Sequence, residues 1–139
     1  MNYDECFESG QLRKGYVGRE ELLNQIKIAE SYLKKAKIVF STEIYDISFL
    51  TAYISIFHSA RALLYKKGCK ERSHFCMFEF IKNEYLDNKV IVRFAEIGQH
   101  YRQTRSMVQY EGSVCSKGIA TEAINDAERF LDEVKKIIK

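Results

Sequence analysis

The chain has 139 residues, and its 22 lysines and arginines against 19 aspartates and glutamates leave a net charge of only +3. That charge is too small to argue by itself for binding to nucleic acid or to a membrane, and no apolar run approaches the ~20 residues that span a bilayer. The length fits one domain over residues 1–139, and four cysteines without a Cys-x-x-Cys pair or a secretory signal predict a cytoplasmic protein with reduced thiols and no membrane contact.

The order of the elements follows from helical periodicity. Proline is absent and apolar residues recur every three or four positions, so the elements are predicted to be helices. Residues 1–18 are expected to form a loosely ordered lead with a short helical turn. The helices expected after it cover about 19–40, 44–67, 73–88, 89–110 and 117–138, the third of them capped by Ser73. Their short connections predict an all-α fold, an antiparallel up-and-down bundle of four to five helices.

Arginines lie within the apolar pattern of one predicted helix and beside that of another. The second helix carries one apolar stripe from Ile47 to Leu64, which passes through Arg61. This arginine is expected to pair with a buried carboxylate, for which Asp46 and Asp126 are candidates, or to extend to solvent.

In the fourth helix, Arg102, Arg105 and Gln109 share a face next to the apolar stripe. If the two arginines have only a structural role, they are expected to form surface salt bridges with Glu96 or Glu111.

A family resemblance emerges from the order of several segments. They are Cys6 to Arg13, Ile28 to Lys37, Tyr53 to Tyr65, Lys70 to His74, Arg105 to Tyr110 and Ala123 to Leu131. Together they resemble the small prokaryotic HEPN-domain proteins, the kind paired with minimal nucleotidyltransferases in toxin–antitoxin systems. The resemblance implies a helical bundle that forms a homodimer, in which the arginine segments of two subunits face each other across a shared cleft.

The resemblance also implies a chemistry, from which this sequence departs. In active members, an arginine followed four to six residues later by a histidine is linked to metal-independent RNA cleavage. The guanidinium would hold the phosphate, and the imidazole would take a proton from a ribose 2′-hydroxyl. Here Arg105 is in the arginine position, but Tyr110 stands where the histidine is expected. A phenol with a reference pKa near 10 is a poor base at neutral pH.

Tyr110 has two further interpretations. In related pairs, transfer of a nucleotide onto a tyrosine close to the motif is thought to control the protein, which makes Tyr110 a candidate modification acceptor. It would otherwise cap the helix end or pack at a dimer seam.

Histidines and cysteines add few candidates. His58 is expected to be a satisfied, buried residue, although together with Arg61 and Arg105 it would form a rearranged ribonuclease site. His100 is expected at the surface. Cys69, His74 and Cys76 match no zinc-binding pattern, so neither a metal nor a cofactor is expected.

These observations lead to one main functional hypothesis and two alternatives. The main one is a protein that binds a nucleotide or RNA phosphate at a dimer cleft, through Arg102, Arg105, Gln109 and Arg61, and that partners a nucleotidyltransferase. The first alternative is a metal-independent endoribonuclease toxin with an atypical base, in which Arg105, Arg102 and Tyr110 are catalytic and His58 is a further candidate. The second is a non-catalytic dimeric scaffold.

Overall fold

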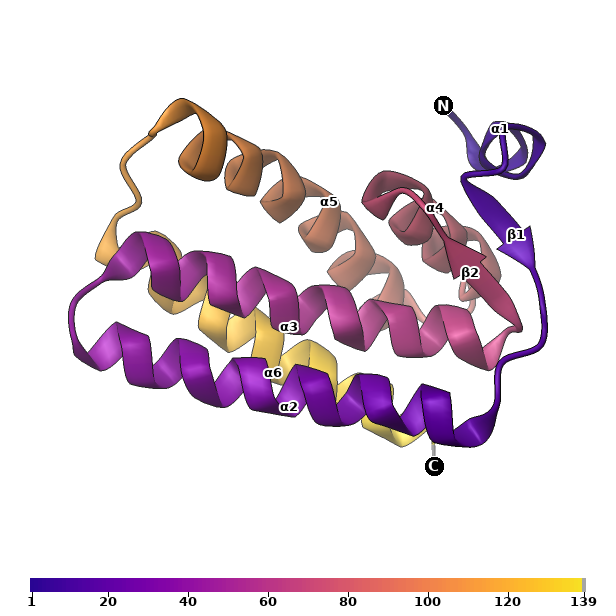
Figure 1. Ribbon diagram of the computed structural model, residues 1–139, viewed down its shortest axis with the longest axis horizontal. Coiled ribbons are helices and arrows are strands. Elements are labelled where there is room, and N and C mark those ends of the chain that lie inside the picture. The colour runs from indigo at the N-terminus through magenta and orange to yellow at the C-terminus, as the bar shows by residue number, and fades with distance from the viewer. Residues whose placement is uncertain (139) are drawn as a thin grey trace.

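Six helices and two short strands form the computed structural model, which describes residues 1–138 (Figure 1). The helices are α1 (Tyr3–Glu8), α2 (Arg19–Ser41), α3 (Tyr45–Lys66), α4 (His74–Glu84), α5 (Lys89–Glu111) and α6 (Lys117–Ile138), and the strands are β1 (Leu12–Lys14) and β2 (Cys69–Glu71). The predicted all-α bundle is confirmed, and the bounds of its four long helices lie within one residue of those expected. α4 ends earlier, at Glu84, because Tyr85 leaves the helix and its hydroxyl donates to the carbonyl of Leu63.

α3 is the central helix, because α2, α4, α5 and α6 all pack against it. The expectation of a single apolar stripe is wrong at Ile47, which is 45% exposed, since several faces of α3 are buried at once. Small polar residues let α2 approach closely: Ser48 donates to the carbonyl of Ala36, and Ser55 to that of Ala29. By length and composition α3 could cross a membrane, but most of it is buried inside the bundle, as in the core helix of a soluble fold.

The first 18 residues, expected to form a loose lead, contain α1 and β1. β1 pairs with β2 in an antiparallel sheet, and a disulfide joins Cys6 of α1 to Cys76 of α4. The expectation of reduced thiols is therefore wrong for this pair. Its two cysteines lie 70 residues apart, so the tertiary fold brings them together and no local pattern could indicate it. Cys69 and Cys115 are buried free thiols.

Local caps fix the starts of α4 and α5, which carry His74 and the two arginines Arg102 and Arg105. Ser73 caps α4, as predicted, and Asn88 caps α5. α5 ends at Gly112, whose φ of 71° lies in the left-handed region that glycine adopts without strain. Gly98 lets α5 lie against the ring of Phe78 on α4. Ser73 thus sets the start of α4, and Gly98 allows the close packing of α5 on α4.

Candidate functional site

Two arginines of α5 lie beside the core without acceptors for part of their guanidinium groups. Arg102 and Arg105 are half-buried next to Tyr101, which is buried. The Nε atoms of both arginines are buried and have no hydrogen-bond partner among residues 1–138. Within the same residues, neither arginine forms the salt bridge with Glu96 or Glu111 that was expected for a purely structural role. A buried donor left unpaired costs about 1–3 kcal/mol, so an anion that accepts from these atoms would stabilise the site.

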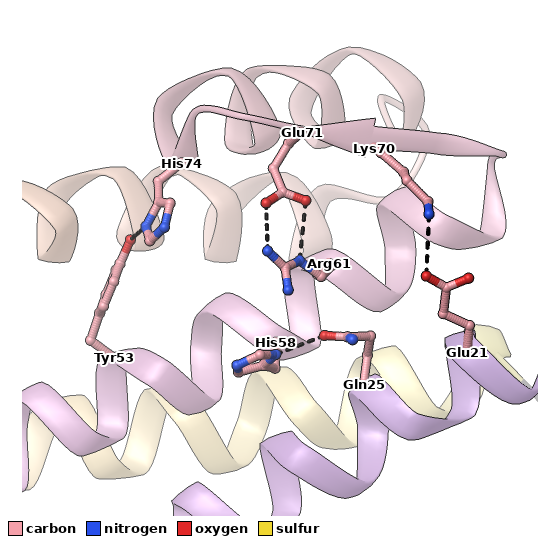
Figure 2. Close-up of polar contacts among 8 residues, drawn as sticks. All are labelled: Glu21, Gln25, Tyr53, His58, Arg61, Lys70, Glu71 and His74. Atoms are coloured by element: carbon pink, nitrogen blue, oxygen red, sulfur yellow. Dashed lines mark hydrogen bonds and ion pairs between the residues drawn. The ribbon is translucent and has the colours of Figure 1, made fainter. Parts of the chain in front are cut away.

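Tyr53 of α3 connects Arg105 to His74. The guanidinium carbon of Arg105 lies 5.4 Å from the centroid of the Tyr53 ring, within range of a cation–π contact. The hydroxyl oxygen of Tyr53 lies 2.8 Å from Nδ1 of His74, which reaches down from the start of α4 (Figure 2). Burial raises the pKa of Tyr53 although Arg105 and Arg102 act to lower it, so the hydroxyl is protonated at neutral pH.

His74 is held as a neutral imidazole among positive charges. Its ring stacks on Phe57 of α3 with a centroid distance of 4.1 Å. Burial is the largest cause that lowers the pKa of His74 to about 4, and the charges of Arg105, Arg61 and Arg102 act in the same direction. Three guanidinium groups therefore lie close enough to influence one half-buried imidazole.

Arg61 has a different partner from those expected. Its Nε and Nη2 donate to the two carboxylate oxygens of Glu71, at 3.1 Å and 2.7 Å (Figure 2). The expectation of Asp46 or Asp126 is wrong: Asp46 is exposed, and Asp126 accepts from the hydroxyl of Tyr101. The reason is the β1–β2 sheet, which carries Glu71 back over α3.

His58 is hydrogen-bonded and half-buried on α3. Its Nδ1 donates to Oε1 of Gln25 at 2.7 Å, and its ring stacks on Tyr32. Burial, followed by the charge of Arg61, lowers the pKa of His58 to about 4. His58 is thus satisfied as expected. The ring of Phe57 contacts the rings of both His58 and His74, so we group the two histidines in one cluster.

The structure does not bring every sequence candidate to this cluster. Gln109 and Tyr110 are exposed near the end of α5, and Tyr110 is 70% exposed. Among residues 1–138, no side-chain hydrogen bond or cation–π contact joins either of them to Arg102 or Arg105. Their roles in binding, catalysis or modification stay predictions. His100 is exposed on α5, as expected.

His74 is the residue that sequence reasoning missed. The one role considered for it was that of a metal ligand with Cys69 and Cys76, and Cys76 forms a disulfide instead. In the part of the chain that the structure describes, no group of three His, Cys, Asp or Glu residues could hold a metal ion. The sequence did contain one indication of its position, because the cap residue Ser73 predicts that His74 is the first residue of a helix. The contact of His74 with Tyr53 joins two different helices, so no local sequence pattern indicates it.

A separate cavity of about 670 Å³ lies between α5 and α6. Exposed basic side chains and apolar side chains both line it, among them Arg93, Ile97, His100, Ile119 and Arg129. Arg102 and Arg105 are not part of its lining. The arginine–histidine cluster is therefore distinct from this cavity, and we define the cluster as Tyr53, His58, Arg61, His74, Arg102 and Arg105.

Comparison with known proteins places most of the chain in one family. The HEPN domain matches residues 23–137, which hold all six cluster residues. Two proteins of Methanocaldococcus jannaschii are similar, both of them named "Putative toxin". One is 31% identical over 122 residues, covering 87% of this chain and 91% of its own, and the other is 29% identical over 126 residues, covering 86% and 83%. The chain therefore belongs to the HEPN domain family, as its sequence resemblance predicted.

Proposed function

We propose that this protein is a toxin-like HEPN protein that binds an RNA or nucleotide phosphate at Arg102 and Arg105. The observation that carries the proposal is the pair of buried Nε donors without acceptors. Phosphate oxygens are strong acceptors, and the planar guanidinium matches their geometry. The names of the two Methanocaldococcus jannaschii relatives support a toxin role.

The contribution of Arg61 to this binding is secondary. Two hydrogen bonds, of 3.1 Å and 2.7 Å, join it to Glu71, whose side chain is only 5% exposed. Its charge is therefore largely neutralised in place, whereas Arg102 and Arg105 have no such partner among the described residues. We assign the direct phosphate contacts to the two α5 arginines and a weaker, longer-range attraction to Arg61.

The proposal extends to assembly and modification in the cytoplasm. We propose a homodimer in which two α5 helices face each other across a cleft, with a nucleotidyltransferase as partner and Tyr110 as acceptor of the nucleotide. Exposed apolar residues around the end of α5, namely Met107, Tyr110 and Val114, support a protein contact there. Light scattering would report a monomer if the dimer is wrong. Mass spectrometry of the protein from its native cell would report an unmodified Tyr110 if the acceptor is wrong.

RNA binding is the direct test of the phosphate site. Fluorescence anisotropy with a labelled single-stranded RNA in chelator compares the parent with Arg105→Ala and with Arg93→Ala. Arg93 is a matched control, because it is exposed on the same helix and its loss removes the same charge. Losing a hydrogen bond to a charged group costs about 1.5–3 kcal/mol, so Arg105→Ala should weaken binding by roughly 10- to 150-fold.

Salt dependence adds a second readout of the same experiment. Each phosphate contact to a single strand contributes a slope of about −0.7 to the dependence of log affinity on log salt. Arg105→Ala should flatten the slope by about that amount, and Arg93→Ala should leave most of it. Equal losses in the two variants would mean that only net charge matters, and the assigned site would be wrong. No RNA or nucleotide binding by the parent would favour the scaffold alternative.

Metal-independent RNA cleavage is the second candidate function. The observation in its favour is a neutral imidazole, that of His74, within the influence of the same arginines that would hold the phosphate. Incubation with total RNA in chelator, beside Arg105→Ala, tests it. Cleavage by the parent that the variant loses would support the candidate, and intact RNA in both reactions would count against it.

A further inference from the structure

We propose that the groove between α5 and α6 is a docking site for an acidic amphipathic helix of a partner protein. The groove is the cavity of about 670 Å³ on the face of α5 that carries Arg93 and Ile97. At ~100° per residue, Arg102 lies about 140° from Ile97 around the helix, and neither Arg102 nor Arg105 lines the groove. The inference therefore does not depend on the proposed phosphate site.

Both walls of the groove have the residue spacing of a helix–helix seam. The α5 wall contains residues separated alternately by three and four positions, namely Val90, Arg93, Ile97, His100 and Thr104. The α6 wall contains a second set with the same spacing, namely Ile119, Glu122, Asp126 and Arg129. Such sets pack directly on a neighbouring helix in coiled-coil-like pairs. Here a cavity separates them, so a further helix can rest in the opening between the two walls.

The length of the groove and its apolar side chains suit a helix better than a compact ligand. The α5 wall runs from Lys89 to Thr104, which is about 22 Å at ~1.5 Å per residue and matches roughly four turns of a bound helix. Val90 on one wall is 46% exposed and Ile119 on the other is 38% exposed. Covering these side chains with the apolar face of a helix removes their surface from water, which favours binding.

The charges at one end of the groove select an acidic partner. Lys89, Arg93 and Arg129 are exposed, and among residues 1–138 none of the three forms a salt bridge. They lie at the same end, because the guanidinium carbon of Arg129 is 5.7 Å from the ring centroid of Phe94, the residue after Arg93. Three cations without carboxylate partners are complementary to acidic side chains on a bound helix.

The other end of the groove carries the opposite charge and so orients the partner. Glu122 lies seven residues before Arg129 on α6, which is about two turns or ~10 Å. Asp126, between them, accepts from the hydroxyl of Tyr101 and is therefore already engaged within the bundle. The bound helix places its acidic residues against the three cations and a basic or amide side chain near Glu122.

A second copy of this chain is the competing occupant of the groove. In the homodimer proposed above, α5 uses the face that carries Arg102 and Arg105, and this leaves the groove face of the same helix free for another protein. The two occupants differ in one measurable property, because only a second copy makes the oligomeric state depend on the groove.

The experiment uses the full chain and a displayed library of 20-residue helical peptides. The library fixes apolar residues at alternating spacings of three and four, and the positions that flank them vary among glutamate, glutamine and lysine. Selection on the parent protein should enrich peptides with glutamates gathered toward one end. Fluorescence anisotropy with a selected peptide then measures its affinity for the parent and for the variants.

Two matched pairs of variants locate the bound peptide. Arg129→Glu should weaken binding roughly 3- to 30-fold, because it removes one exposed ion pair and adds repulsion, whereas Lys34→Glu makes the same charge change on an exposed residue of α2 outside the groove and should have little effect. Ile119→Ser should weaken binding roughly 2- to 5-fold through lost apolar burial. Its control is Ile47→Ser, since Ile47 is 45% exposed and is the third residue of α3, as Ile119 is of α6.

Each outcome supports or overturns the assignment. Acidic peptides that lose affinity for Arg129→Glu and Ile119→Ser but not for the two controls support it, as does tighter binding of a glutamate-to-lysine peptide to Arg129→Glu than to the parent. Enrichment of basic or uncharged peptides, equal losses in variants and controls, or no enrichment at all overturns it. Sedimentation equilibrium tests the competing occupant: a dimeric parent that becomes monomeric in Ile119→Ser but not in Ile47→Ser would make the groove an interface between copies of this chain, and the partner helix would be wrong.

Discussion

The ion pair between Arg61 and Glu71 gives the sharpest test of how this bundle is held together. Glu71 accepts two hydrogen bonds from the guanidinium, and the side chains are 25% and 5% exposed. The substitution Glu71→Gln keeps the size of the side chain and removes its charge. It leaves Arg61 facing a neutral amide in a site that was shaped around a carboxylate.

The expected magnitude follows from burial. Removing one partner of a fully buried ion pair costs about 3–5 kcal/mol, because the other charge stays uncompensated. Arg61 is a quarter exposed and can shift its head group toward water, so a loss of about 2 kcal/mol is expected. At roughly 2.1 cal/mol/K of unfolding entropy per residue, that corresponds to a fall in Tm of about 7 °C.

Urea unfolding, monitored by far-ultraviolet circular dichroism, measures this loss in the free energy of unfolding. The control is Glu128→Gln, which breaks the pair between Lys37 and Glu128, whose side chains are 49% and 47% exposed. Exposed pairs contribute about 0–1 kcal/mol, so the control should stay close to the parent. If Glu71→Gln and Glu128→Gln cost the same, burial does not decide the strength of the pair and the reasoning is refuted.

Three further predictions concern packing, covalent linkage and pH. Gly98→Ala should lower the free energy of unfolding by about 1–3 kcal/mol, because a Cβ there would lie 2.4 Å from the buried ring of Phe78, which outweighs the better helix propensity of alanine. Replacing Cys6 and Cys76 together by alanine should cost about 2–4 kcal/mol in urea unfolding, since the disulfide closes a long loop. Stability should fall as the pH is lowered from about 6.5 to about 4, because His74 has its pKa lowered to about 4 by folding and the unfolded chain then binds more protons.

Each of these three has its own control. Gly118→Ala should be neutral or stabilising, since the nearest atom to its Cβ, Oγ of Ser116, is 3.8 Å away. A reducing agent should destabilise the parent but not the double alanine variant. For pH, the stabilising contribution of the neutral imidazole is complete above the unfolded pKa near 6.5, and NMR titration that places the His74 pKa at or above 6.5 would contradict the argument.

The two arginines of α5 could be recognised as site candidates from the sequence because they lie on one helix. Arg102 and Arg105 are three residues apart, so any α-helix puts them on neighbouring parts of one face. Their place beside the core also followed from periodicity, and the structure puts them half-buried next to Tyr101. The choice between salt bridges and free donors did not follow, since it depends on which carboxylates the other elements bring near.

The sequence by itself determined the helices, most of their bounds, the Ser73 cap and the family, because periodicity, capping and ordered segments are local or collinear properties of the chain. Only the tertiary structure decided the contacts of His74 with Tyr53, of Arg61 with Glu71, and of Cys6 with Cys76. Each of these joins different elements. The register of β1 on β2 and the burial of α3 on several faces set them, and neither is encoded in the spacing of residues along a single helix.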